Sequence, residues 1–373
     1  MKWTTEADEA SDWVLNLAER DAYQETRSPG RPTGREAFAA LVEVHRRELQ
    51  VHCYRMLGSV LDAEDLVQET LLRAWKNRGT FEGRAPMRAW LYKIATNACL
   101  DELAKRPRRG LPPDLYPPAE PDGPLEATVA DPIWLEPYPD GLLGSFRNDP
   151  AARYDLRESI SLAFLVALQT LPPRQRAILL MRDVIGLRAA EVANLLEDSV
   201  SAVNSVLYRA RVRLEKHYSR PSPQVGTADS TQRRLLERYV AAWEAADIDT
   251  LVELLKEDAR FPMPPIPTWV QGRAAIRNFV SRHILDGDAR GRWRLVPTQA
   301  NLQPAFAWYR RRENPPGFAA FAIQVVTLEG SAVAAATTFA FPQLFAAFGL
   351  PPELDENGRV DSAPVRGVPE RGH

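Results

Sequence analysis

The chain has 373 residues, enough for two or three domains of ordinary size. Its 47 basic and 49 acidic side chains nearly cancel, which argues against a uniformly basic nucleic-acid-binding protein. Two cysteines are too few for a disulfide framework and fit a reducing compartment. No apolar signal segment and no run of about 18 apolar residues is present, so we expect a cytoplasmic protein that does not enter a membrane.

Proline is the outlier of the composition, with 31 residues. Eleven prolines lie between Pro107 and Pro150, and residues 110–150 carry eight acids and one base. No helical or strand period is recognisable there, which predicts a linker. We expect seven segments: a flexible acidic N-terminus (1–34), a helical domain (35–106), a proline-rich acidic linker (107–152), a second helical domain (153–218), a short linker (219–229), a third domain (230–350) and a disordered tail (351–373).

The near-zero total charge hides an uneven distribution. Residues 35–109 carry 14 bases and 10 acids, and residues 151–220 carry 11 bases and 7 acids. Each of these blocks therefore has a net charge of +4, whereas residues 110–150 have a net charge of −7. Two basic blocks on either side of an acidic connector indicate a polyanionic partner.

The first block has helical periodicity throughout. We expect one helix ending at Gly58, a second with Asp62 as its N-cap, and a third with Pro86 at its first position. The second helix carries a polar face, which taken alone is more often a solvated surface than a binding site. The residues of that face are Asp65, Gln68, Glu69 and Arg73.

The third helix of this block interleaves aromatic and basic residues. Trp90 and Tyr92 alternate with Arg88 and Lys93. Aromatic rings stack on unpaired bases and cations bind phosphates, so the pattern suits single-stranded nucleic acid. For Trp90 alone, a place in the core of a helical bundle is the commoner explanation.

The second block predicts a helix followed by a helix-turn-helix. Pro172 and Pro173 introduce the preceding helix, and Ser199 is suited to cap the last one. The turn carries Glu197 and Asp198 where glycine is usual, so we expect strained geometry there. An ordinary helical hairpin with a basic end is the alternative.

The last helix of this block would present short polar residues at its start and arginines beyond. Short polar side chains reach base edges in a major groove, and arginine binds guanine or phosphate. The expected DNA-binding residues are Ser201, Ala202, Asn204, Ser205, Tyr208, Arg209, Arg211 and Arg213.

The third block begins with two amphipathic helices and continues with strand-like runs around a further helix. This order predicts an α+β cone. His283 lies on a helix and Asp247, Asp249 and Asp258 lie at helix ends, where structural roles explain them. We therefore favour a regulatory or ligand-sensing module over a catalyst, with no cofactor and no metal. The expected strands fall within 259–264, 291–301, 305–311, 318–329 and 331–341.

Two segments together resemble a known family. DAEDLVQETLLRAW followed by FEGRAPMRAWLYKIATNACLDEL resembles region 2 of a sigma-70 family RNA polymerase factor of the extracytoplasmic-function (ECF) group. LPPRQRAILLMRDVIGLRAAEVANLLEDSVSAVNSVLYRARVRL resembles region 4, and the third block is similar to a SnoaL-like domain. The resemblance implies a multidomain fold: two all-α helical domains, namely a region 2 bundle and a region 4 helix-turn-helix, and a C-terminal SnoaL-like α+β cone.

The resemblance also implies residue roles. The polar face listed above would dock on the β′ clamp helices of core RNA polymerase, which has β and β′ subunits, and the linker would lie along the polymerase. Region 4 would bind the −35 element as double-stranded DNA. The cone would have a pocket lined by Met263, Trp269, Phe279, Trp308 and Phe339. The residues expected to contact and melt the −10 element are Arg84, Met87, Arg88, Trp90, Lys93, Asn97 and Asp101.

Two functions remain open from the sequence. The first is a promoter-recognition factor, not an enzyme, whose C-terminal domain regulates it from within the same chain, as an inhibitor or an activator. The second is a SnoaL-type isomerase or cyclase fused to a DNA-binding arm. The polar face combined with a helix-turn-helix favours the first, because an enzyme needs neither.

Overall fold

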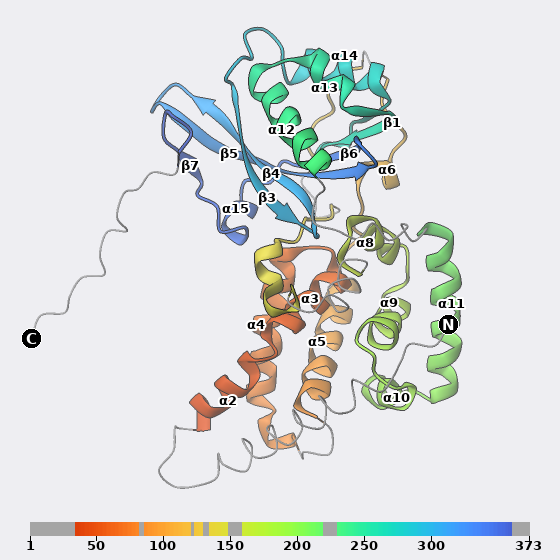
Figure 1. Ribbon diagram of the computed structural model, residues 1–373. Helices are drawn as coiled ribbons and strands as arrows, with labels where there is room; N and C mark the ends of the chain where they lie inside the picture. The colour runs from red at the N-terminus through yellow and green to blue at the C-terminus, as the bar shows by residue number, and fades with distance from the viewer. Residues whose placement is uncertain are drawn as a thin grey trace, which may run out of the picture. The chain divides into compact units, whose positions relative to one another are not determined.

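The computed structural model describes residues 34–81, 86–120, 123–129, 134–147, 159–218 and 230–359. These residues form two compact units (Figure 1). The first contains the described residues before Gly110 and those from Leu142 to Tyr218; the second contains residues 110–141 and those from Ser230 onward. Among the described residues, no helix is long and apolar enough to cross a membrane, and no cluster of three potential metal ligands occurs.

The first unit opens with two helices where the sequence predicted one. α2 (Gly34–Glu43) and α3 (Arg46–Leu57) are separated at Val44 and His45. His45 is the N-cap residue of α3, and its imidazole binds the Glu48 carboxylate in the first turn at 2.5 Å. α3 ends at Gly58, as predicted, because glycine adopts the positive φ of 74° that the C-cap requires.

α4 (Val60–Lys76) and α5 (Met87–Leu103) complete the first helical bundle. Two predicted helix starts were wrong. Ser59, not Asp62, caps α4: its hydroxyl accepts the Asp62 backbone N–H at 3.1 Å. α5 begins at Met87, one residue later than predicted, so Pro86 is its N-cap residue rather than its first residue.

The second helical region consists of α8 (Leu162–Gln169), α9 (Pro173–Leu179), α10 (Ala189–Leu196) and α11 (Val200–His217). A π-helical segment, Leu180–Val184, follows α9, where the sequence predicted one continuous helix. Ser199 caps α11 as predicted, accepting the Ala202 N–H at 3.1 Å. The expected strain is present: Glu197, between α10 and α11, has φ 54° and ψ 50°.

Two buried arginines join the helical regions of this unit. Arg55 of α3 donates to the backbone oxygen of Ser159 at 3.0 Å and to its hydroxyl at 2.5 Å. Arg176 of α9 donates to the Met56 carbonyl of α3, and also to the side-chain oxygen of Gln169. Burial lowers the pKa of Arg176 to about 9, and carbonyl oxygens rather than a carboxylate satisfy its guanidinium.

The second unit is the predicted α+β cone. α12 (Ser230–Ala245), α13 (Ile248–Glu253) and α14 (Arg273–His283) pack with a sheet of order β2-β1-β6-β5-β4-β3. Most pairings are antiparallel; β1 and β6 pair in parallel. The strands are β1 (Leu255–Pro262), β2 (Trp269–Gln271), β3 (Trp293–Ala300), β4 (Gln303–Arg312), β5 (Gly317–Glu329) and β6 (Ala332–Phe339).

The cone extends beyond residue 350, where the sequence predicted a disordered tail. α15 (Leu344–Ala347) is followed by β7 (Glu353–Leu354), which pairs with β5. The Arg312 guanidinium binds the Glu353 carboxylate at 2.6 Å and fastens β7 to β4. The tail therefore contributes at least a short strand to the sheet, and residues after 359 lie outside the described part.

The described residues between 110 and 141, within the predicted linker, belong to the same unit as the cone. This stretch contains a short helix, α6 (Pro112–Leu115), and a 3-10 helix begins at Asp140. It bonds to the cone at several places: Ala119 N–H donates to the Trp269 carbonyl at 2.8 Å, and Val129 N–H to the Pro265 carbonyl at 3.0 Å. The prediction that it lacks regular structure missed these contacts, because its hydrogen-bond partners are about 140 residues away in the sequence.

Candidate nucleic-acid interface

The outer face of α11 is polar at its start and basic towards its end. Ser201, Asn204 and Ser205 are exposed there, and Tyr208 has a relative exposure of 70%. Val203 and Leu207 point the other way, into the core. Seven of the eight DNA-binding residues predicted on α11 are exposed; Ala202 is half-buried.

The arginines of α11 have different surroundings. Arg211 is held by both carboxylate oxygens of Asp183, at 2.8 and 2.6 Å. Arg209 and Arg213 instead line a shallow surface hollow with Tyr208, Val212, Lys216 and His217. Binding of a phosphate or a base to Arg209 or Arg213 therefore does not require an ion pair like that of Arg211 and Asp183 to break.

The residues predicted to contact the −10 element lie along α5. Asn97 is exposed, whereas Met87 is buried and Trp90 is half-buried against the Phe81 ring, with centroids 5.2 Å apart. Met87 therefore lies in the core, and the core explanation given for Trp90 holds in part. Arg84 lies outside the described residues.

Each charged −10 candidate on α5 has an acidic or basic partner. Arg88 donates to Glu48 at 2.8 Å, and Lys93 binds the carboxylate of Glu197, in the helix-turn-helix turn, at 3.1 Å. Asp101 accepts from Arg73 at 3.4 Å. These side chains must exchange partners if they are to bind nucleic acid.

A buried polar cluster lies between α3 and α5. The His52 ring donates to or accepts from Thr96 at 2.9 Å and meets the Tyr92 ring edge-on. Burial and the nearby Arg55 charge lower the pKa of His52 to about 3, so this imidazole is neutral. The cluster ties α3 to α5, the helix that carries most of the residues predicted to contact the −10 element.

The exposed face of α4 lies opposite its buried stripe. Asp65 and Gln68 are exposed, and Glu69 pairs with Arg73 at 2.8 Å. Leu72 lies on this face with a relative exposure of 56%, and it was not among the residues predicted for the polar face. The sequence does contain a signal for this residue. Leu72 follows Gln68 by four residues, and this helical spacing places an apolar side chain on the predicted polar face.

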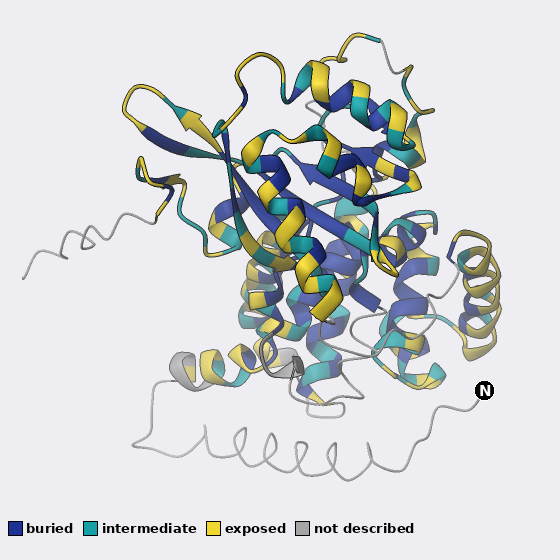
Figure 2. Ribbon diagram, turned by 45° about the horizontal axis from the view of Figure 1, so that its top comes forward, coloured by how far each residue is buried: buried dark blue, intermediate teal, exposed yellow. Residues whose placement is uncertain are grey.

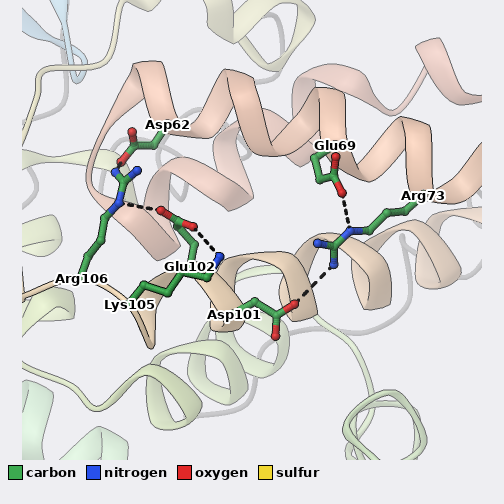
Figure 3. Close-up of polar contacts among 7 residues, drawn as sticks. All are labelled: Asp62, Glu69, Arg73, Asp101, Glu102, Lys105 and Arg106. Carbon is green, nitrogen blue, oxygen red and sulfur yellow. Dashed lines mark hydrogen bonds and ion pairs between the residues drawn. The ribbon is translucent and has the colours of Figure 1, made fainter.

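Ion pairs connect this face of α4 to α5 at both ends (Figure 3). At one end Arg73 bridges Glu69 and Asp101. At the other, Arg106 binds Asp62 at 2.8 Å and Glu102 at 2.6 Å. Arg73 is thus an internal bridge between a predicted polymerase-binding residue and a predicted −10 residue.

The predicted pocket residues of the cone are packed together. Met263, Phe279 and Trp308 belong to one apolar core, and the indoles of Trp243 and Trp308 meet at 4.6 Å. The inner side of α12 is correspondingly buried, whereas its outer side is exposed (Figure 2). The Trp269 indole N–H donates to the Tyr116 carbonyl of the linker at 3.0 Å.

Three family models match the chain in order. Sigma-70 region 2 matches residues 41–109, sigma-70 region 4 matches residues 161–214, and a SnoaL-like domain matches residues 236–340. The ECF RNA polymerase sigma factor SigG of Mycobacterium tuberculosis is 44% identical over 319 residues, 85% of either chain. The chain belongs to the ECF RNA polymerase sigma factors.

Other relatives support the assignment of the chain to this family. SigW of Bacillus subtilis, also an ECF sigma factor, is 31% identical over 48% of this chain and 88% of its own. The crystal structure of M. tuberculosis SigJ, 24% identical, matches 84% of this chain and all of its own with a TM-score of 0.53, which shows the shared fold. The protein is therefore a transcription initiation factor that works with core RNA polymerase and promoter DNA, and not an enzyme.

Proposed function

We propose that this sigma factor acts in the cytoplasm, docks on the β′ clamp helices through α4, contacts the melted −10 element through α5 and binds the duplex −35 element through α11. The observation that carries the proposal is the exposed face of α4. Leu72 shares this face with the polar side chains of Asp65, Gln68 and Glu69, on the same unit as a capped helix-turn-helix. An apolar anchor inside a polar rim is typical of protein interfaces.

The polymerase contact is tested by affinity purification of core polymerase with the full chain. We expect stable co-purification of the wild-type chain and loss of it in Leu72→Asp. Failure of the wild-type chain to bind core polymerase would overturn the proposal.

We further propose that the cone modulates activity through the linker. Residues 110–141 bond to the cone, so their path along the β and β′ subunits competes with these bonds. A variant that loosens the linker from the cone should therefore change promoter-directed transcription. Unchanged transcription in the Asn301→Gly variant described below would contradict a modulating role.

A further inference from the structure

Glu197 occupies a backbone conformation that glutamate rarely adopts. It ends α10 in the left-handed region, with φ 54° and ψ 50°. Glycine has no steric penalty there, and asparagine tolerates it better than most residues. Residues kept in an unfavourable backbone conformation tend to cluster at functional positions.

The carboxylate of Glu197 has a specific partner in the other helical region. Its Oε1 accepts from Lys93 Nζ at 3.1 Å, and α10 lies against α5. The side chains of Lys93 and Glu197 are 34% and 81% exposed. Exposed ion pairs contribute little to stability and are screened by salt, so stability alone does not account for a glutamate at this strained position.

Lys93 is the only lysine among the residues proposed to contact the −10 element, and this inference rests on that proposed function. An ammonium bound to a carboxylate is not available to a phosphate. Arg88 of α5 and Arg73 of α4 are likewise paired with carboxylates, but their partners Glu48, Glu69 and Asp101 belong to the same bundle. Glu197 alone among these acids comes from the helix-turn-helix.

We infer that Glu197 is an intramolecular substitute for a DNA phosphate: in the free chain its carboxylate occupies the Lys93 ammonium, and promoter DNA must displace it. The contact links the two DNA-binding regions. Movement of the helix-turn-helix away from α5 would free Lys93, so the availability of this ammonium to a phosphate depends on separation of the two regions.

The first experiment measures the reactivity of Lys93 in the full chain. Acetylation by an N-hydroxysuccinimide ester is quantified by mass spectrometry, with the exposed Lys76 as the internal reference. Glu197→Asn removes the carboxylate, and asparagine tolerates the left-handed backbone conformation at this position. We expect Lys93 to react about two- to fivefold faster in this variant at low salt, with a smaller difference at high salt.

Asp198→Asn is the matched control. It removes the same charge one residue away, but Asp198 pairs with Arg174 at 2.6 Å inside the second helical region. Lys93 reactivity should not change in this control. An unchanged rate in Glu197→Asn, or an equal rise in both variants, would overturn the inference.

The second experiment measures the affinity of the same proteins for a fluorescent single-stranded DNA of mixed sequence, about 20 nucleotides long. Glu197→Asn should bind more tightly than Asp198→Asn by a similar two- to fivefold factor. Equal affinities would show that the pair does not control access of DNA. If the wild-type chain instead fails to bind core polymerase, the proposed function fails, while Lys93 reactivity still decides whether Glu197 masks the lysine.

Discussion

Tyr138 and Asn301 are joined by two hydrogen bonds although they lie 163 residues apart in the chain. The Tyr138 N–H donates to Asn301 Oδ1 at 2.9 Å, and the Asn301 N–H donates to the Tyr138 carbonyl at 2.9 Å. Asn301 is fully buried and has φ 56°. An acidic, proline-rich stretch is thereby fixed to the turn between β3 and β4.

Asn301→Gly should loosen this attachment. Glycine keeps the positive φ and the backbone N–H, but removes Oδ1 and leaves the buried Tyr138 N–H without its acceptor, at a cost of about 1–3 kcal/mol. We expect faster hydrogen–deuterium exchange over residues 134–140 in the full chain. Asn357→Gly, in an exposed turn, is the control and should leave exchange there unchanged. Wild-type protection in Asn301→Gly would show that the side-chain bond does not fasten the linker.

His52 predicts an acid sensitivity of the first unit. Its pKa of about 3 in the folded chain lies below the ordinary value of 6.5, so the unfolded chain binds a proton first as the pH falls. The stability that neutral His52 provides is complete above pH 6.5 and is lost progressively towards pH 3. Each pH unit well below 6.5 costs up to about 1.4 kcal/mol.

His52→Gln should flatten this dependence, because glutamine bonds to Thr96 but does not titrate. The free energy of unfolding, measured by denaturant titration at pH 7 and pH 5, should fall less in this variant than in the wild-type chain. His217→Gln, at an exposed position, should behave as the wild type does. Equal losses in all three proteins would mean that His52 does not control the acid response.

Arg209 and Arg211 should differ in their importance for −35 binding. Arg209→Ala is expected to weaken binding to promoter duplex DNA by about 1–3 kcal/mol if it contacts a base. Arg211→Ala should cost less, because Asp183 already holds that guanidinium and must release it. Electrophoretic mobility shift with a cognate promoter measures both. A larger loss for Arg211 would contradict the order inferred from the ion pair.

Leu72→Asp should abolish or strongly weaken core polymerase binding without unfolding the chain. The side chain is exposed, so the substitution leaves the helical core intact, and a hot-spot leucine contributes about 2 kcal/mol or more to an interface. Val44→Asp, also at an exposed aliphatic residue of region 2, is the matched control. Polymerase affinity, measured by fluorescence anisotropy, should fall only in Leu72→Asp; an equal fall in both would remove Leu72 from the interface.

Local patterns in the sequence were sufficient for much of the helical unit. Ser199 is identifiable as a cap and Gly58 as a helix end, because both depend on residues within one turn. The absence of glycine at Glu197 likewise predicts strain from the sequence alone, and the positive φ confirms it. Ser59 was missed because it competes with Asp62, three residues on, for the same role.

By itself the sequence determined the order of the regions, the family and the candidate faces of α4, α5 and α11, since helical periodicity and short motifs carry this information. Only the tertiary structure decided which of these charges are already paired. Lys93 and Glu197 lie 104 residues apart, and the linker's partners lie in the cone. Such contacts depend on how whole elements pack, and no local pattern encodes a hydrogen bond between residues so distant in the chain.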